Sequence, residues 1–265
     1  MGVLNITPDS FSDGGRFWRG APDLPRIRDT AERMVAAGAA LLDVGGESTR
    51  PGADAVDEAE ECRRVLPVVE ALADLDTIIS VDTRKSGVAR RAAEAGARLL
   101  NDVSGFRDPA MIEVLARTGM AGCIMHMRGE PRTMQETPVY ADVLAEVRAF
   151  FAERVAACQA AGVPADRLVL DPGFGFGKTL AHNVHLLREL EGLRIGALPI
   201  MVGLSRKRMI GALTGRDLPQ RMIGSVAAAL LAAERGADIV RVHDVAETAD
   251  ALRILEALGD PESNG

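Results

Sequence analysis

Polar and charged side chains recur at the points where short apolar runs of this sequence end. Several of them are carboxylates, and the others are cationic, amide or imidazole groups. The set comprises Asn5, Asp43, Asp82, Asn101, His126, Asp171, Lys207, Arg241 and His243. Charged groups are costly to bury without partners, so this many at comparable positions would make a poor packed core. A structural salt bridge is the alternative for any single member, but the whole set predicts a ligand site on which its members converge.

Two of these residues, Arg241 and His243, are two positions apart, so on a strand their side chains share a face while Val242 points the other way. Together with segment 203–207 they would form a cationic pocket at the end of the last two predicted strands. That position is where barrel proteins commonly bind phosphate. Arg208, by contrast, is expected at a solvated helix start.

The stretch from Asp171 to Thr179, DPGFGFGKT, differs from a nucleotide-binding loop by one residue. A Walker A loop requires glycine where Pro172 stands, and the G-x-G-x-x-G spacing of dinucleotide sites is absent. The glycines are better explained by a backbone that passes close to a ligand, with Asp171 directed toward it. His182 and His185 follow at helical spacing, but the sequence supplies no third metal ligand near them.

A repeating pattern positions these residues. A helical stretch ends in Gly, three or four apolar residues follow, and the run stops at a polar or charged residue. Glycine suits the residue after a helix because it adopts the left-handed conformation at little cost. Continuous apolar runs are typical of parallel strands, which are covered on both faces. The clearest copies lead from Gly38, Gly96, Gly119, Gly162 and Gly236 into predicted strands at residues 41–43, 99–101, 123–126, 168–171 and 239–241.

Three further apolar runs, at residues 3–6, 77–81 and 199–202, complete eight strands, each followed by a helical segment. The predicted helices span residues 23–37, 57–73, 85–95, 109–118, 139–161, 181–191, 219–235 and 246–258. Eight such units predict an α/β protein that forms a (β/α)₈ TIM barrel, with a doubly wound open sheet as the alternative. We assign residues 1–258 to a single domain and residues 259–265 to a frayed C-terminal tail.

Segments that follow the predicted strands are long, whereas several segments that lead into strands have two or three residues. Residues 7–22 and 45–56 are rich in Gly, Pro, Ser and Asp. Loops at the carboxyl ends of strands are where barrel enzymes place their chemistry. We therefore expect these loops and the polar strand-end residues to surround one mouth.

The composition excludes several classes of protein. A formal net charge of −7 and an aromatic content of 3% argue against a nucleic-acid-binding surface, which needs clustered cations or stacking platforms. The sequence contains no run of eighteen apolar residues and no leader-like start, so we expect a cytoplasmic protein with no membrane contact. Cys62, Cys123 and Cys158 are far apart and lack C-x-x-C spacing, which predicts reduced and mostly buried thiols.

Eight segments, taken in order, resemble the motifs of the dihydropteroate synthase family. They are residues 1–15 (MGVLNITPDSFSDGG), 43–52 (DVGGESTRPG), 80–83 (SVDT), 101–102 (ND), 125–127 (MHM), 171–178 (DPGFGFGK), 205–207 (SRK) and 241–244 (RVHD). The resemblance extends from residue 1 to about residue 258, and the two longest motifs make chance negligible. It implies a pterin-binding transferase of folate biosynthesis, in which the amine of p-aminobenzoate displaces pyrophosphate from 6-hydroxymethyl-7,8-dihydropterin diphosphate with the help of Mg²⁺.

The resemblance also implies which residues form the site. The pterin would be bound by Asp82, Asn101, Met125, Asp171, Phe176 and Lys207, and p-aminobenzoate by Phe11, Thr49, Pro51, Ser205 and Lys207. Pyrophosphate would be bound by Asn5, Arg50, Arg241 and His243, with Mg²⁺ held through Asn5. Asp82, Asp171, Lys207 and Arg241 would act on the reacting groups. No general base is assigned, because an aniline-type nitrogen is neutral and nucleophilic near pH 7.

Two other functions remain open at this point. A methyltransferase that passes a methyl group from a methylated folate to a corrinoid protein shares the barrel and the pterin-binding carboxylates, but it needs no pyrophosphate pocket. A paralogue that binds pterins without catalysis is favoured by loss of Thr49, Arg50 or Lys207, and all three are present. The resemblance further implies inhibition by sulfonamides, which mimic p-aminobenzoate, and a homodimer formed through the late helices.

Overall fold

Eight parallel strands and nine α-helices alternate along the part of the chain that the computed structural model describes, residues 1–8, 15–48, 55–129, 134 and 138–259. The strands are β1 (Gly2–Asn5), β2 (Leu41–Gly45), β3 (Ile78–Asp82), β4 (Leu99–Asp102), β5 (Ala121–Met125), β6 (Leu168–Asp171), β7 (Met201–Val202) and β8 (Ile239–Val240). The helices are α1 (Leu24–Ala36), α2 (Glu58–Leu72), α3 (Ser86–Ala95), α4 (Pro109–Thr118), α5 (Val143–Ala160), α6 (Leu180–Arg188), α7 (Arg208–Thr214), α8 (Met222–Glu234) and α9 (Val245–Leu258).

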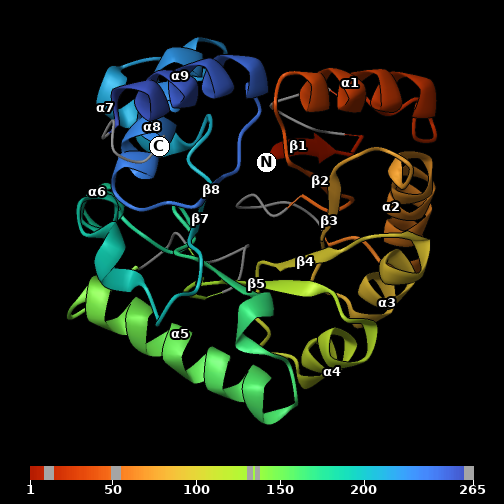
Figure 1. The fold of residues 1–265 in the computed structure, drawn as a ribbon, viewed down its shortest axis with the longest axis horizontal. Coiled ribbons are helices and arrows are strands. Elements are labelled where there is room, and N and C mark those ends of the chain that lie inside the picture. The colour runs from red at the N-terminus through yellow and green to blue at the C-terminus, as the bar shows by residue number, and fades with distance from the viewer. Residues whose placement is uncertain (9–14, 49–54, 130–133, 135–137, 260–265) are drawn as a thin grey trace.

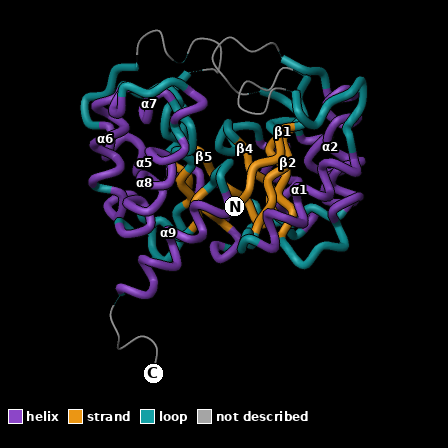
Figure 2. The backbone as a smooth tube through the Cα atoms, turned by 90° about the horizontal axis from the view of Figure 1, so that it is seen from above, coloured by secondary structure: helices purple, strands orange, loops and turns teal. Residues whose placement is uncertain are grey.

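The strands follow one another in chain order, and every pair is parallel. Strands β1 to β6 form one sheet, and β7 pairs with β8 in a second. Single parallel bridges join the two sheets at both junctions, between Leu170 and Ile200 and between Gly2 and Val242. The helices surround the strands in Figure 1, and Figure 2 shows the strands enclosed between α5 and α6 on one side and α1 and α2 on the other. The prediction of one α/β domain of eight parallel strands is confirmed.

Local sequence signals begin and end these helices. Aspartates precede α1, α2, α4 and α5, and each accepts a hydrogen bond from a backbone N–H in the first turn, which satisfies a donor that the helix itself cannot. Gly96 and Gly119 follow α3 and α4 with φ of +119° and +77°, the left-handed conformation that the repeating pattern predicts.

Alternation along the strands separates two apolar layers. Leu100, Ile124 and Leu170 belong to the large core between the sheet and the helices. Their sequence neighbours Leu99, Cys123 and Val169 pack with Met1 and Met201 in a smaller cluster on the opposite face of the strands. Burial on both faces explains why the strands are continuously apolar in the sequence. All three cysteines are buried and free, as predicted.

The element boundaries differ from the predicted ones in a few places. Helix α7 was absent from the prediction, because it has only seven residues and includes Gly211, a poor helix former. Helix α5 starts at Val143 rather than at residue 139, and Asp142 is its N-cap. Helix α9 ends at Leu258, where the predicted domain ends, but residues 260–265 of the predicted tail lie outside the described residues. None of the described helices is both long and apolar enough to cross a bilayer.

Candidate active site

Four strands bring one charged cluster together inside the ring of strands. Arg241 donates from Nε to Oδ2 of Asp43 over 2.6 Å and from a terminal nitrogen to Oδ2 of Asp82 over 3.1 Å. Ser80 donates to Oδ1 of Asp43 over 2.5 Å, and Nδ2 of Asn101 donates to its Oδ2 over 3.2 Å. The strand register explains the Ser80 contact, because Asp43 lies opposite Ser80 in the neighbouring strand. Asn101 and Arg241 reach Asp43 from strands that are not its register partners at these positions.

The electrostatics of this cluster favour a ligand that brings N–H donors. Burial raises the pKa of Asp82, the negative charge of Asp43 raises it further, and the Arg241 cation opposes both effects. The side chain of Asp82 keeps 12% of its surface exposed, so a ligand can reach it. The Oδ1 atom of Asn101 is buried and has no hydrogen-bond partner among the described residues. An orphaned buried acceptor is costly, and a donor from a ligand would satisfy it.

The mouth is the opening at the carboxyl ends of the strands, and Asp171, the last residue of β6, lies there. Its Oδ1 atom accepts a hydrogen bond from the backbone N–H of Gly173 over 2.7 Å, which fixes the orientation of the carboxylate. Burial raises the pKa of Asp171, and the positive charge of Lys207 is the largest effect that opposes the rise. The Asp171 carboxylate therefore lies within electrostatic reach of the Lys207 cation.

Lys207 stands at the N-cap of α7. Its Nζ donates to the carbonyl of Phe174 over 2.6 Å and lies 4.8 Å from the centre of the Phe176 ring. Burial lowers the pKa of Lys207 to about 8, although Asp171 raises it. Phe176 also packs against an apolar cluster, so an aromatic plane and a cation adjoin the carboxylates. The remaining members of that cluster are Val103, Met125, Met127 and Met134.

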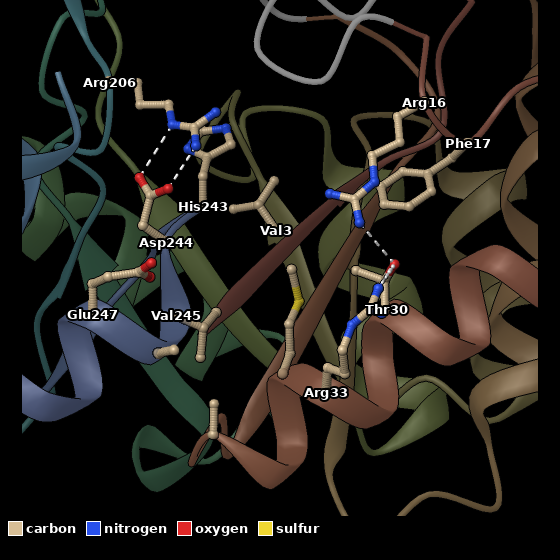
Figure 3. A pocket seen from close by; sticks show the side chains of 13 residues that line it. Val3, Arg16, Phe17, Thr30, Arg33, Arg206, His243, Asp244, Val245 and Glu247 are labelled. Carbon is tan, nitrogen blue, oxygen red and sulfur yellow. Dashed lines mark hydrogen bonds and ion pairs between the residues drawn. The ribbon is translucent and has the colours of Figure 1, made fainter. Parts of the chain in front are cut away.

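A cavity of about 500 Å³ lies beside this cluster, between α1 and the start of α9. His243 and Arg206 lie on one wall and Arg16 on the other, as Figure 3 shows. Arg206 is paired with Asp244, and the imidazole Nδ1 of His243 lies 3.0 Å from Oγ of Ser205. None of the carboxylates of the Arg241 cluster lines this cavity, so it is distinct from the mouth.

The structure places the predicted site residues in two groups. Asp82, Asn101, Asp171, Lys207 and Arg241 converge at the mouth, with Met125 and Phe176 in the adjoining apolar cluster. The second group contains Ser205 and His243, which contact each other. Arg241 is directed into the carboxylate cluster rather than toward His243, so the two residues do not form the cationic pocket that the sequence predicted. Asn5 is the last residue of β1. Phe11, Thr49, Arg50 and Pro51 lie outside the described residues. Arg208 is exposed, as predicted.

His126 does not converge on the mouth with the others, which corrects the sequence prediction. It is buried, and its ring packs against Phe150 of α5 with the ring centres 5.1 Å apart. The cause is strand parity, because Cys123 and Met125 face the interior of the ring of strands and His126, one residue further, faces the helices.

Sequence reasoning missed two further polar groups. The Ser80 hydroxyl donates to Asp43 and holds it in place. Ser80 is two residues before Asp82 on the same strand, so the two side chains share a face, and this spacing could have identified Ser80. Lys178 is buried at the end of the glycine-rich loop and contacts His126. The sequence suggested only that this lysine is not part of a Walker A loop.

The chain is similar to known proteins over nearly its whole length. A family model described as pterin binding enzyme matches residues 1–243. The chain is 49% identical over 265 residues to the dihydropteroate synthase of Escherichia coli strain K12, a match that covers all of this chain and 93% of the relative.

Solved structures that are similar over nearly the whole chain include two dihydropteroate synthases with bound ligands. One is the Yersinia pestis dihydropteroate synthase in a sulfonamide drug complex, which is 51% identical with a TM-score of 0.93 and covers 97% of this chain and 92% of its own. The other is the Burkholderia cenocepacia dihydropteroate synthase complexed with 7,8-dihydropteroate, which is 48% identical with a TM-score of 0.88 and covers 100% of this chain and 92% of its own.

Proposed function

We infer that this chain, which belongs to the family of pterin-binding enzymes, catalyses the dihydropteroate synthase reaction. In that reaction the amine of p-aminobenzoate attacks the methylene carbon of 6-hydroxymethyl-7,8-dihydropterin diphosphate. A C–N bond forms, the C–O bond to the diphosphate breaks, and the amine loses a proton. The substrates are small molecules, and the sulfonamide complex of the similar Yersinia pestis enzyme supports sulfonamides as inhibitors of this chain.

The observation that supports this function is that the buried acceptors of Asp171 and Asn101 lie at the same mouth as the Lys207 cation. A pterin presents an amino group and a ring N–H on one edge and a carbonyl beside them. Asp171 can accept from both donors, and Lys207 can donate to the carbonyl. The unpartnered Oδ1 of Asn101 and the exposed part of Asp82 supply acceptors for the rest of the ring. The ring of Phe176 offers a flat apolar surface.

The same cluster can stabilise both ends of the bond that breaks. Positive charge develops on the pterin methylene, which Asp82 and Asp171 would stabilise. Negative charge develops on pyrophosphate, which Arg241 would stabilise from the mouth. We propose that His243, which lines the neighbouring cavity, contacts the far end of the same anion. We propose Arg50 as a further cation for the pyrophosphate. The attacking nitrogen is neutral near pH 7, so no general base is required. We propose that p-aminobenzoate contacts Ser205 and Lys207 together with Phe11, Thr49 and Pro51.

Magnesium is part of the proposal. Mg²⁺ takes oxygen ligands and usually keeps several waters, so an amide oxygen together with the phosphate oxygens of a substrate is a donor set that fits it. The described residues contain no group of three or more His, Cys, Asp or Glu side chains that could hold a metal by themselves. We therefore propose that Asn5 contributes the protein ligand and that the ion neutralises the diphosphate charge.

The deciding experiment measures pyrophosphate release by the purified chain. We expect release that requires the pterin diphosphate, p-aminobenzoate and Mg²⁺ together, and inhibition by sulfamethoxazole that added p-aminobenzoate relieves. Release without p-aminobenzoate would contradict the synthase reaction. Binding of the pterin without any release would identify a paralogue that lacks the synthase activity, and methyl transfer from a methylated folate would identify the methyltransferase.

We also propose that the chain forms a homodimer through α8 and its neighbours. Helix α8 contains no charged residue before Glu234, and Ile223 and Leu231, two helical turns apart, are exposed on it. Ile223 exposes 77% of its surface, and Ile254 on the adjacent α9 exposes 60%. Apolar surface without charge is typical of the centre of a subunit interface.

Substituting Ile223→Glu should therefore convert the dimer to a monomer. A buried carboxylate without a partner costs several kcal/mol, which exceeds what a modest interface can absorb. Light scattering should give twice the chain mass of 28.1 kDa for the wild type and one chain mass for the variant. Val139→Glu is the matched control, because Val139 is also exposed but lies before α5. A wild-type monomer, or a dimer that survives Ile223→Glu, would refute the interface.

A further inference from the structure

Lysine is rare in this chain. Only three of the 31 basic residues are lysines, Lys85, Lys178 and Lys207, and arginine supplies the rest. Lysine differs from arginine in placing its charge on one compact tetrahedral group, which can donate in three directions from a single atom. Lys207 belongs to the proposed pterin site. Lys178 has no role in the reaction as derived above, although it is the most deeply buried of the three, with 3% of its surface exposed.

The Nζ atom of Lys178 lies inside a cage of acceptors. It contacts Nδ1 of His126 at 2.9 Å and the carbonyls of His126, Gly173 and Phe176 at 3.2, 3.0 and 3.1 Å. None of the ion pairs between described residues includes Lys178. The ammonium group is therefore held by backbone dipoles, and it links the end of β5 to the loop at residues 172–177.

The side chain of His126 suits this contact. Burial, together with the positive charge of Lys178, lowers the pKa of His126 to about 2, so the imidazole is neutral and one ring nitrogen can accept. Burial also lowers the pKa of Lys178 to about 7, while the nearby carboxylate of Asp171 raises it. The lysine thus points back into its own loop, unlike a Walker A lysine, which reaches outward to phosphate.

The loop that Lys178 closes has little conformational preference of its own. Gly173, Gly175 and Gly177 have φ of +64°, +81° and +61°, the region that glycine adopts freely and other residues avoid. The backbone also lies directly against the segment after β5, because a Cβ on Gly173 would stand 2.0 Å from the carbonyl oxygen of His126. Glycine permits this conformation but does not select it, so the selection must come from contacts such as those of Lys178.

The same loop forms part of the ligand site. The N–H of Gly173 orients Asp171, and the carbonyl of Phe174 accepts from Lys207. The Phe176 ring faces the Lys207 cation. The carbonyls of Gly173 and Phe176 are two of the acceptors in the Lys178 cage, so the lysine fixes both ends of the segment that presents these groups.

We propose that Lys178 is a positioning residue for the pterin site, because its ammonium group selects the loop conformation that aims Asp171 and Phe176 at the ligand. Its role is geometric: the residue does not touch the substrate. A planar guanidinium could not point at carbonyls in three directions from one atom, which explains why lysine stands here in a chain that otherwise uses arginine.

The test substitutes Lys178→Met, which keeps the length of the side chain and removes its donors. Amide hydrogen exchange at residues 173–177 should accelerate at least tenfold, while β6 and α6 exchange as in the wild type. In the synthase assay, which rests on the proposed function, KM for the pterin diphosphate should rise at least tenfold and KM for p-aminobenzoate should stay within threefold. A loop that exchanges at the wild-type rate, or an equal rise in both KM values, would overturn the proposal.

Two further variants keep the outcome interpretable. Thr179→Ala is the control, because the Thr179 side chain caps α6 but lies outside the lysine cage; it should lower Tm and leave the loop exchange and both KM values unchanged. His126→Leu removes one of the four acceptors and replaces a buried ring with a similar volume, so it decides the question if Lys178→Met does not fold. In His126→Leu, amide exchange at residues 173–177 should be faster than in the wild type, and slower than in Lys178→Met if the latter folds. Exchange at the wild-type rate in His126→Leu would count against the proposed role of the cage. The exchange measurement needs no activity, so failure of the synthase reaction would leave it standing.

Discussion

Substituting Asp171→Asn is expected to weaken binding of a pterin by about 2–4 kcal/mol, which is roughly 30- to 1000-fold. The N–H of Gly173 already occupies one side-chain oxygen of Asp171 at 2.7 Å. An asparagine would keep its single oxygen on that N–H and turn its NH₂ group toward the ligand. The ring would then meet a donor where its own donors need acceptors, which costs more than a missing hydrogen bond.

Calorimetric titration of a pterin that lacks the diphosphate isolates this effect from the anion site. The fold should tolerate the change, because burial raises the pKa of Asp171 and the amide removes a charge that is costly to bury. Asp57→Asn is the matched control: it makes the same substitution at the exposed N-cap of α2, and it should bind the pterin as the wild type does. Affinity of Asp171→Asn within threefold of the wild type would remove Asp171 from the pterin site.

Removing the cation of the central cluster should have the largest effect on stability. Arg241→Met leaves Asp43 and Asp82 buried together without the guanidinium that now contacts both. Breaking a buried ion pair by deleting one partner costs about 3–5 kcal/mol. Pyrophosphate affinity should fall as well, and by more than the affinity for a pterin without the diphosphate, because the guanidinium opposes the charge of the anion directly.

The stability loss should depend on pH with a definite sign. Burial and Asp43 already raise the pKa of Asp82 above its ordinary value of 3.8, and loss of Arg241 removes the effect that opposes the rise. A carboxyl with a raised pKa in the folded state stabilises the fold at low pH and loses that contribution as the pH rises through the raised pKa. In the wild type the pKa of Asp82 is already raised to about 8, so the two proteins lose this contribution together up to that pH and diverge above it. The deficit of Arg241→Met relative to the wild type should therefore be larger at pH 9.5 than at pH 6.

Chemical denaturation at both pH values measures this difference. Combining Arg241→Met with Asp43→Asn should recover part of the lost stability, because one unpaired buried charge is removed while an oxygen remains for the Ser80 hydroxyl. A deficit that is equal at both pH values, with no recovery in the double variant, would mean that Arg241 acts through packing rather than charge.

Much of the fold could be predicted because its signals are local. The glycines after several helices and the continuous apolar strands each depend on a few neighbouring residues, and they placed most elements within a few positions. Helix α7 was not predicted, because a helix of seven residues is too short to show a clear apolar periodicity. The register of the strands lay beyond these signals, because pairing joins residues far apart in the sequence, such as Asp43 and Ser80.

The sequence by itself determined which chemical groups the site has, since motif order and strand ends identified Asp82, Asn101, Asp171, Lys207 and Arg241. Only the tertiary structure decided how those groups are partnered. In the structure Arg241 contacts two carboxylates, His126 faces the helices, and Lys178 is buried among backbone carbonyls. The physical reason is that a residue type and its spacing specify a side chain and the local backbone. Its partners depend on register and side-chain direction, which the packed fold alone sets.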